Sequence, residues 1–128
     1  MIHFDTNALV ALPLWARAGH PLVSRVLAGE PAAACAVVWY EFLSGPVAEE
    51  EVRLARAFLQ GRIVAVSEED AQLAAHLFNA AGRRRGLKTD ALIAAVALRA
   101  GADFATLNQA DFAPFVAQGL RLVASSLP

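Results

Sequence analysis

Cysteine, lysine and long apolar segments are all scarce in this sequence. A single cysteine, Cys35, excludes an internal disulfide and favours a reducing compartment, so we expect a cytoplasmic protein. The net charge of −1 excludes electrostatic attraction of nucleic acid to the whole surface. The longest apolar run, residues 32–40, is far shorter than a membrane-spanning helix, and we see no secretory signal, so we expect no membrane contact.

Apolar residues, in contrast, are abundant. Hydrophobic residues make up 57% of the chain and charged residues 18%, which excludes a disordered protein. A chain of 128 residues can bury a substantial core, so we expect residues 1–128 to form one domain.

Apolar segments of strand length alternate with segments of helical periodicity along the chain. This alternation predicts parallel β-α-β units and an α/β fold of three layers, α/β/α, around a roughly five-stranded parallel sheet. Right-handed crossovers place the carboxyl ends of all the strands at one edge, where such sheets bind ligands. We expect strands at residues 2–4, 33–38, 63–66, 104–106 and 120–123, and helices at residues 6–15, 20–28, 39–43, 49–59, 68–84, 88–98 and 112–116.

The segment at residues 88–98 is the most informative. After Asp90 it is apolar on every side of the expected helix, and a helix of that kind is buried. The helix therefore carries the Asp90 carboxylate toward the middle of the fold. An ordinary explanation stays open, in which Thr89 caps the helix and Asp90 complements its dipole.

Most of the twelve acidic residues have an ordinary place. The acids at residues 49–51 and 68–70 suit the first turns of exposed helices, Glu30 lies in a turn, and Asp103 begins a strand at the edge away from ligands. Four acids remain, and the expected fold brings at least three of them to the carboxyl edge of the sheet. They are Asp5, Glu41, Asp90 and Asp111.

Each of these four acids also has a structural explanation. Asp5 and Asp111 can cap the helices that follow them, and Glu41 can lie on a helix surface. Those explanations predict no shared location, whereas gathered carboxylates repel one another unless they are protonated or neutralised by a cation. Oxygen ligands favour Mg²⁺ or Mn²⁺ over zinc. Such an ion can polarise a phosphodiester and activate a water molecule, so the pattern predicts phosphoester hydrolysis.

Five segments, which together extend over the whole chain, carry a resemblance to a known family. They are Phe4-Asp5-Thr6-Asn7, Tyr40-Glu41-Phe42-Leu43-Ser44-Gly45, Thr89-Asp90-Ala91-Leu92-Ile93-Ala94-Ala95, Ala105-Thr106-Leu107-Asn108-Gln109-Ala110-Asp111-Phe112 and Gly119-Leu120-Arg121-Leu122-Val123. In this order they resemble the PIN-domain ribonucleases, especially the VapC-type toxins of bacterial toxin–antitoxin pairs.

The resemblance implies a PIN-like fold with a five-stranded parallel sheet and a Mg²⁺- or Mn²⁺-dependent endoribonuclease. Asp5 and Asp90 would be the closest metal ligands, with Glu41 and Asp111 completing the site directly or through water. Some members place the last acid where Asn108 stands, so Asp111 and Asn108 can share the fourth role. The resemblance also implies an RNA substrate, a cognate antitoxin protein and a homodimer. The residues that would orient carboxylates, water or phosphate are Thr6, Asn7, Thr106 and Asn108.

Four basic residues lie just before Asp90. Arg83, Arg84, Arg85 and Lys88 can simply form a solvated helix end. Their position beside the expected site favours a second hypothesis, in which Arg84, Arg85 and Lys88 guide the RNA backbone without reading its sequence.

Three other functions compete with this one. A phosphoacceptor receiver domain has a similar acidic site, but it needs an acid pair after the first strand, where Thr6 and Asn7 follow Asp5. It also needs a lysine after the last-but-one strand, and the only lysine here is Lys88. A catalytically silent PIN-like binding module is the second alternative, and a metal-dependent DNA nuclease is the third, because nothing in the sequence reads the RNA 2′-hydroxyl.

Overall fold

The computed structural model describes residues 1–123. Residues 124–128 lie outside the described part, so one domain over residues 1–128 stays a prediction. The elements are β1 (Ile2–Phe4), α1 (Thr6–Ala18), α2 (Pro21–Leu27), β2 (Ala32–Cys35), α3 (Ala36–Ser44), α4 (Glu49–Phe58), β3 (Ile63–Val64), α5 (Glu68–Ala80), the 3-10 helix η1 (Arg85–Leu87), α6 (Lys88–Arg99), β4 (Asp103–Ala105), α7 (Gln109–Val116) and β5 (Arg121–Val123).

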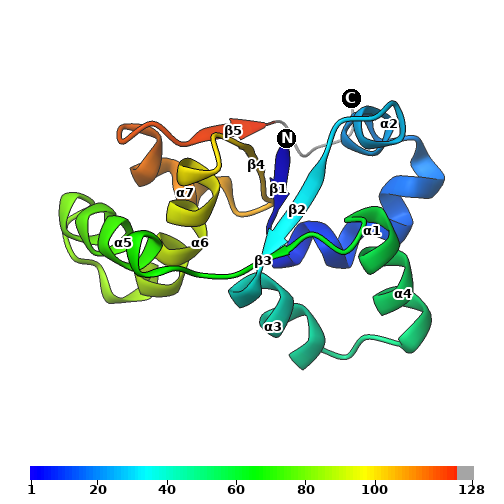
Figure 1. Ribbon diagram of the computed structural model, residues 1–128, viewed down its shortest axis with the longest axis horizontal. Helices are drawn as coiled ribbons and strands as arrows, with labels where there is room; N and C mark the ends of the chain where they lie inside the picture. Colours follow the sequence, from blue (N-terminus) through cyan, green and yellow to red (C-terminus); the bar gives the residue numbers. More distant parts are fainter. Residues whose placement is uncertain (124–128) are drawn as a thin grey trace.

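The five strands form one parallel sheet in the order β3-β2-β1-β4-β5. β1 is central: the chain adds β2 and β3 on one side of it, then β4 and β5 on the other. Helices α1, α2 and α4 lie on one side of the sheet and α5 and α6 on the other (Figure 1), which confirms the predicted α/β architecture. The strand order reverses between β1 and β4, and open parallel sheets bind ligands outside the carboxyl ends of the strands at such a point.

The second strand is shorter than the sequence predicts. Residues 33–38 are expected to be extended, but β2 ends at Cys35 and α3 begins at Ala36. The prediction is wrong because a continuous apolar run does not distinguish a buried strand from a buried helix. α3 buries Val38, Trp39 and Phe42. Glu41 therefore lies in the second turn of α3, whereas the sequence predicts it in the first turn of a helix that begins at residue 39.

The helix predicted for residues 68–84 is also too long. α5 ends at Ala80, and Gly82 and Arg83 then adopt left-handed backbone conformations with φ of 86° and 58°. A left-handed residue ends a helix, and glycine adopts it without strain. The arginine run therefore lies in the segment between α5 and α6, and its last residue begins η1. It does not form the end of α5.

α6 is buried on all sides, as its sequence predicts. Its buried residues are Ala91, Ile93, Ala94, Ala95, Val96 and Ala97, and five of these are consecutive. Asp90 belongs to the first turn of this helix, so the buried helix brings the Asp90 carboxylate close to the core. No side chain caps α6, whose amino-terminal capping position is Leu87, so the suggested cap by Thr89 is not formed.

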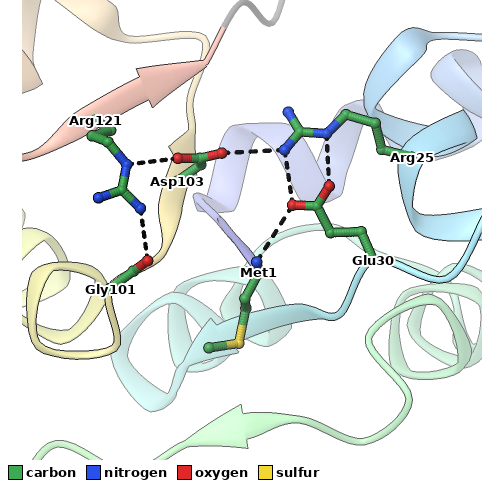
Figure 2. A network of polar contacts seen from close by, with 6 residues as sticks. All are labelled: Met1, Arg25, Glu30, Gly101, Asp103 and Arg121. Atoms are coloured by element: carbon green, nitrogen blue, oxygen red, sulfur yellow. Dashed lines mark hydrogen bonds and ion pairs between the residues drawn. The ribbon is translucent and has the colours of Figure 1, made fainter.

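Ion pairs join the amino ends of the strands, at the edge opposite the candidate site (Figure 2). Arg25 contacts Glu30 at 2.8 Å and Asp103 at 3.1 Å, and Arg121 contacts Asp103 at 2.9 Å. The hydrogen bond from Arg121 is the main cause that lowers the pKa of Asp103, with a further hydrogen bond from Arg25. Asp103 is thus occupied by structural contacts, as its place at the start of a strand predicts. No helix within residues 1–123 is long and apolar enough to span a bilayer.

Candidate active site

Asp5 lies at the carboxyl end of the central strand, where β1 turns into α1. It caps α1: its Oδ1 accepts a hydrogen bond from the Thr6 backbone N–H at 2.9 Å. Its Oδ2 accepts a second one from the Thr106 hydroxyl at 2.7 Å. Burial raises the pKa of Asp5, these two hydrogen bonds lower it, and the charges of Glu41 and Asp111 raise it. The capping explanation and the site explanation therefore both apply to Asp5.

Glu41 reaches the same region from α3. Its side chain is exposed, and its Oε1 accepts a hydrogen bond of 2.7 Å from the Thr6 hydroxyl. Thr6 therefore touches both acids, Asp5 through its backbone N–H and Glu41 through its hydroxyl. The predicted orienting role of Thr6 has a direct geometric basis in these two contacts.

Asp90 is half-buried and, among residues 1–123, has no hydrogen-bond donor or cation beside its carboxylate. Its pKa is raised to about 6, mainly by burial and also by the charges of Asp5, Asp111 and Glu41. Charges of one sign thus gather around Asp90, and within the described residues no basic side chain offsets them. This is the electrostatic condition under which a bound cation is favourable.

Three of the four candidate acids line one cavity of about 530 Å³ at the carboxyl edge of the sheet. We call it the carboxylate cavity. Its lining comes from the start of α1, from α3, from α6 and from the segment after β4, so distant parts of the chain meet there. The lining residues are Asp5, Thr6, Asn7, Val10, Ala11, Glu41, Asp90, Leu107 and Asn108.

Asp111 and Asn108 occupy different positions relative to this cavity. α7 begins at Gln109, three residues earlier than the sequence predicts, and Asp111 lies exposed in its first turn, outside the cavity lining. Its charge still raises the pKa values of Asp5 and Asp90. Asn108 lies in the cavity lining, so the shared fourth role stays a prediction, with Asn108 nearer and Asp111 more remote.

Hydrogen bonds hold the segment after β4 against the start of α1. The Leu107 N–H donates to Asn7 Oδ1 at 3.0 Å, and the Asn108 N–H donates to Thr106 Oγ1 at 3.0 Å. Thr106, in turn, is 0% exposed and donates to Asp5. The backbone of residues 106–108 is therefore fixed relative to the Asp5 carboxylate.

Sequence reasoning missed the apolar part of the lining, formed by Val10, Ala11 and Leu107. Helical spacing could have indicated two of them, because Val10 and Ala11 follow Thr6 and Asn7 by one turn on the same face. Leu107 lies between Thr106 and Asn108, both of which the resemblance had already indicated as site residues. The candidate site residues were selected among polar and charged side chains, so these three apolar residues were not included.

The carboxylate oxygens of the cavity suit a hard divalent cation that has water molecules as most of its ligands. Within residues 1–123, no three His, Cys, Asp or Glu side chains are arranged to hold an ion between them. Mg²⁺, however, keeps several waters and usually binds only one or two carboxylates. Asp90 is free to act as a ligand, and a carboxylate has about four acceptor positions, so Asp5 keeps capacity beyond its two hydrogen bonds.

The basic residues do not line the carboxylate cavity. Arg84 and Arg85 are exposed just before α6, and the Lys88 ammonium lies over the Phe78 ring at 5.9 Å from its centroid. Arg83 donates a hydrogen bond to Asn79 at 2.8 Å. Lys88 and Arg83 thus pack on α5. Of these four basic residues, Arg84 and Arg85 make no side-chain hydrogen bond, ion pair or ring contact within residues 1–123.

A family model of the PIN domain matches residues 2–113. The chain belongs to the PIN domain family, as the resemblance in its sequence predicts. No curated protein matches it.

Several solved structures have a similar fold. One is a toxin–antitoxin complex from Klebsiella pneumoniae, at 23% identity and a TM-score of 0.68 over 100% of both chains. A second is FitAcB from Neisseria gonorrhoeae, at 20% identity and a TM-score of 0.67 over 98% of both chains. A third is VapBC2 from Rickettsia felis bound to a DNA fragment from its promoter, at 21% identity and a TM-score of 0.63 over 96% of this chain and 98% of the other. At these identities the likeness concerns the fold.

Proposed function

We propose that this protein is a Mg²⁺- or Mn²⁺-dependent endoribonuclease and the toxin of a type II toxin–antitoxin pair. The observation that carries the proposal is the convergence of Asp5, Glu41 and Asp90, from three separate elements, on one cavity at the sheet's switch point. Membership of the PIN domain family supports it. The raised pKa of Asp90 supports it too, because gathered carboxylates of this kind suit a cation.

In this proposal Asp5 and Asp90 hold the cation directly, and Glu41 and Asp111 act directly or through water. When bound, such a cation polarises a phosphodiester and makes a water molecule a better nucleophile. The chain's own residues set the geometry. Thr106 and the Thr6 backbone orient Asp5, and the Thr6 hydroxyl orients Glu41.

Arg84 and Arg85 are proposed to contact the RNA backbone. Both are exposed beside the start of α6, the helix that carries Asp90. Phosphate contacts supply affinity that weakens with salt but carry no sequence information. Lys88 has a weaker case, since its ammonium is engaged with the Phe78 ring.

The proposed partners are a cognate antitoxin protein and a second copy of the chain, in the cytoplasm. The similar folds include chains of a toxin–antitoxin complex from Klebsiella pneumoniae and of VapBC2 from Rickettsia felis, and this supports an antitoxin. The homodimer rests on the family resemblance of the sequence alone.

Cleavage of a structured RNA in the presence of Mn²⁺ tests the proposal. We expect the wild-type protein to cut it, and Asp5→Asn and Asp90→Asn to lose cleavage by at least about 100-fold while keeping the fold by circular dichroism. Glu69→Gln is the matched control, because Glu69 is an exposed acid outside the cavity. Unchanged cleavage in both aspartate variants would remove the catalytic assignment. RNA binding without any cleavage by the wild type would instead indicate the silent binding module.

A further inference from the structure

We propose that the apolar side of the carboxylate cavity is a subsite for one unpaired RNA base, and that Asn108 selects which base enters. This inference rests on the proposed endoribonuclease function and specifies how its substrate would be recognised. It concerns Val10 and Leu107, which have no role in the cation chemistry, and gives Asn108 a role in base recognition beside its predicted share in the fourth position.

The carboxylate cavity has two chemically different sides. Asp5, Glu41 and Asp90 supply negative charge, while Val10, Ala11 and Leu107 supply an apolar wall. Single exposed apolar side chains are ordinary on a protein surface. Val10 and Leu107 are different, because they are 55% and 49% exposed, come from separate elements and line the same cavity. Covering their surface with a neutral apolar face removes it from water and lowers the free energy.

Asn108 adds a polar group beside this wall. Its backbone N–H donates a hydrogen bond to the Thr106 hydroxyl, but its side-chain amide caps no helix and makes no hydrogen bond within residues 1–123. An asparagine amide presents one acceptor and two donor hydrogens. The cavity therefore offers hydrogen bonding to a neutral partner in addition to the charge of its carboxylates.

The backbone that carries the Leu107 and Asn108 side chains is held in place relative to the Asp5 carboxylate. Leu107 is fixed by its N–H bond to Asn7 Oδ1 at 3.0 Å. Asn108 is fixed by its N–H bond to Thr106 Oγ1 at 3.0 Å, and Thr106 donates to Asp5 at 2.7 Å. A base bound by Leu107 and Asn108 would therefore lie next to the Asp5 carboxylate. Because the base would be bound next to the carboxylates, its position would determine which phosphodiester bond of the RNA is cleaved.

A nucleobase matches both features of this subsite. Its faces are apolar and its edge carries hydrogen-bond donors and acceptors, and unpaired bases of RNA can be splayed out into protein sites. Sites of this kind hold the base between apolar side chains while hydrogen bonds read its edge. The paired donor and acceptor of an asparagine amide are complementary to adenine at N6 and N7. We therefore expect adenine at one position next to the cut. A basic side chain of a protein partner would be drawn to the carboxylates and would leave the apolar wall unused.

Two sequencing readouts on one random single-stranded RNA library test the subsite. The ends produced by cleavage with Mn²⁺ report the bases beside the cut. RNA retained by the protein in EDTA reports base preference without any dependence on catalysis. The variants are Asn108→Ala and Leu107→Ala. Val116→Ala is the control, because Val116 is 46% exposed on α7 and does not line the cavity. Thermal melting checks that each variant folds.

We expect the wild type and Val116→Ala to favour adenine at one position by at least about fivefold in both readouts. Asn108→Ala should reduce that preference to less than about twofold, and Leu107→Ala should weaken RNA retention severalfold without changing the favoured base. An unchanged base preference of Asn108→Ala in the RNA retained in EDTA would overturn the subsite, and cleavage by the wild type would still support the endoribonuclease. A wild type that neither cuts nor retains RNA would overturn the proposed function, and the subsite with it.

Discussion

The Thr106 hydroxyl donates a hydrogen bond of 2.7 Å to Asp5 Oδ2 and joins residues that are 101 positions apart in the sequence. The contact follows from strand register: Phe4 pairs with Ala105 in the parallel sheet, so the next residues of both strands, Asp5 and Thr106, come side by side. The Asp5 N–H also donates to the Ala105 carbonyl at 2.9 Å. The central strand pair of the sheet thus sets the position of Asp5 directly.

Thr106→Val tests how much this hydrogen bond contributes. The buried Asp5 carboxylate would lose a donor, and the Asn108 N–H would lose its acceptor. We expect the free energy of unfolding to fall by about 1–3 kcal/mol at pH 7.5 in urea denaturation. The pKa of Asp5 should rise, because the hydrogen bond from Thr106 now lowers it. Thr106→Ser, which keeps the hydroxyl, should lose clearly less, and an equal loss would mean that packing of the methyl group is what matters.

Asp90→Asn should stabilise the fold at neutral and alkaline pH. The pKa of Asp90 is raised from 3.8 to about 6 in the folded chain, so the folded state holds this proton more tightly than the unfolded state does. Ionised Asp90 therefore costs stability above about pH 6, and the cost disappears as the pH falls toward 4. We expect Asp90→Asn to gain roughly 1–2 kcal/mol over wild type at pH 8, which is less than the full pKa shift would give because solvent screens the half-exposed carboxylate, and to gain little at pH 4. Glu69→Gln should differ little from wild type at either pH, and an equal gain for it would remove the link to the cavity.

Divalent cations should raise the melting temperature of the wild type at pH 7.5. The expected cause is preferential binding to the folded state, which stabilises by about 2.7 kcal/mol at a concentration 100 times the dissociation constant. Differential scanning fluorimetry with Mn²⁺ or Mg²⁺ measures this shift without reference to activity. Asp90→Asn should lose most of the shift, because a proposed ligand and a repelling charge are removed together. No shift in the wild type at millimolar Mn²⁺ would count against a metal site.

The fold is predictable from the sequence where local signals agree with tertiary packing. The apolar segment after Asp90 indicates a buried helix, and α6 is buried on all sides. The boundary between β2 and α3 is not predictable in this way, because the apolar run at residues 32–39 is compatible with a buried strand and with a buried helix. The end of α5 depends on left-handed backbone at Gly82 and Arg83, and arginine gives no signal for that conformation.

The candidate site is predictable to the extent that strand ends determine it. Asp5 and Thr106 follow two adjacent strands, so parallel topology alone brings them together. Glu41 enters from a helix, and its location depends on a contact with Thr6 that no spacing in the sequence indicates. Asn108 lines the cavity and Asp111 does not, because α7 begins three residues earlier than the sequence predicts. A shift of less than one turn decides which of them lines the cavity.

His3 should make the protein sensitive to mild acid through a mechanism unrelated to the carboxylates. It lies in the central strand at 2% exposure, and its Nε2 has no hydrogen-bond partner within residues 1–123. Its pKa is lowered from 6.5 to about 4, mainly by burial and also by the charge of the chain's amino terminus, while the charge of Asp70 opposes the shift. Between pH 6.5 and 4, His3 is therefore protonated in the unfolded chain but still largely neutral in the folded chain. The free energy of unfolding consequently falls as the pH falls.

The size of this effect follows from the pKa difference, roughly 2–3 kcal/mol when fully developed near pH 4. His3→Phe removes both the titrating group and the unsatisfied nitrogen while keeping a planar side chain. Urea denaturation of both proteins at pH 7.5, 5.5 and 4.5 should show the variant gaining stability relative to wild type as the pH falls. Carboxylates titrate alike in the two proteins, so the difference between them isolates His3. A constant difference at all three pH values would show that His3 takes up its proton in the folded state, contrary to its buried position.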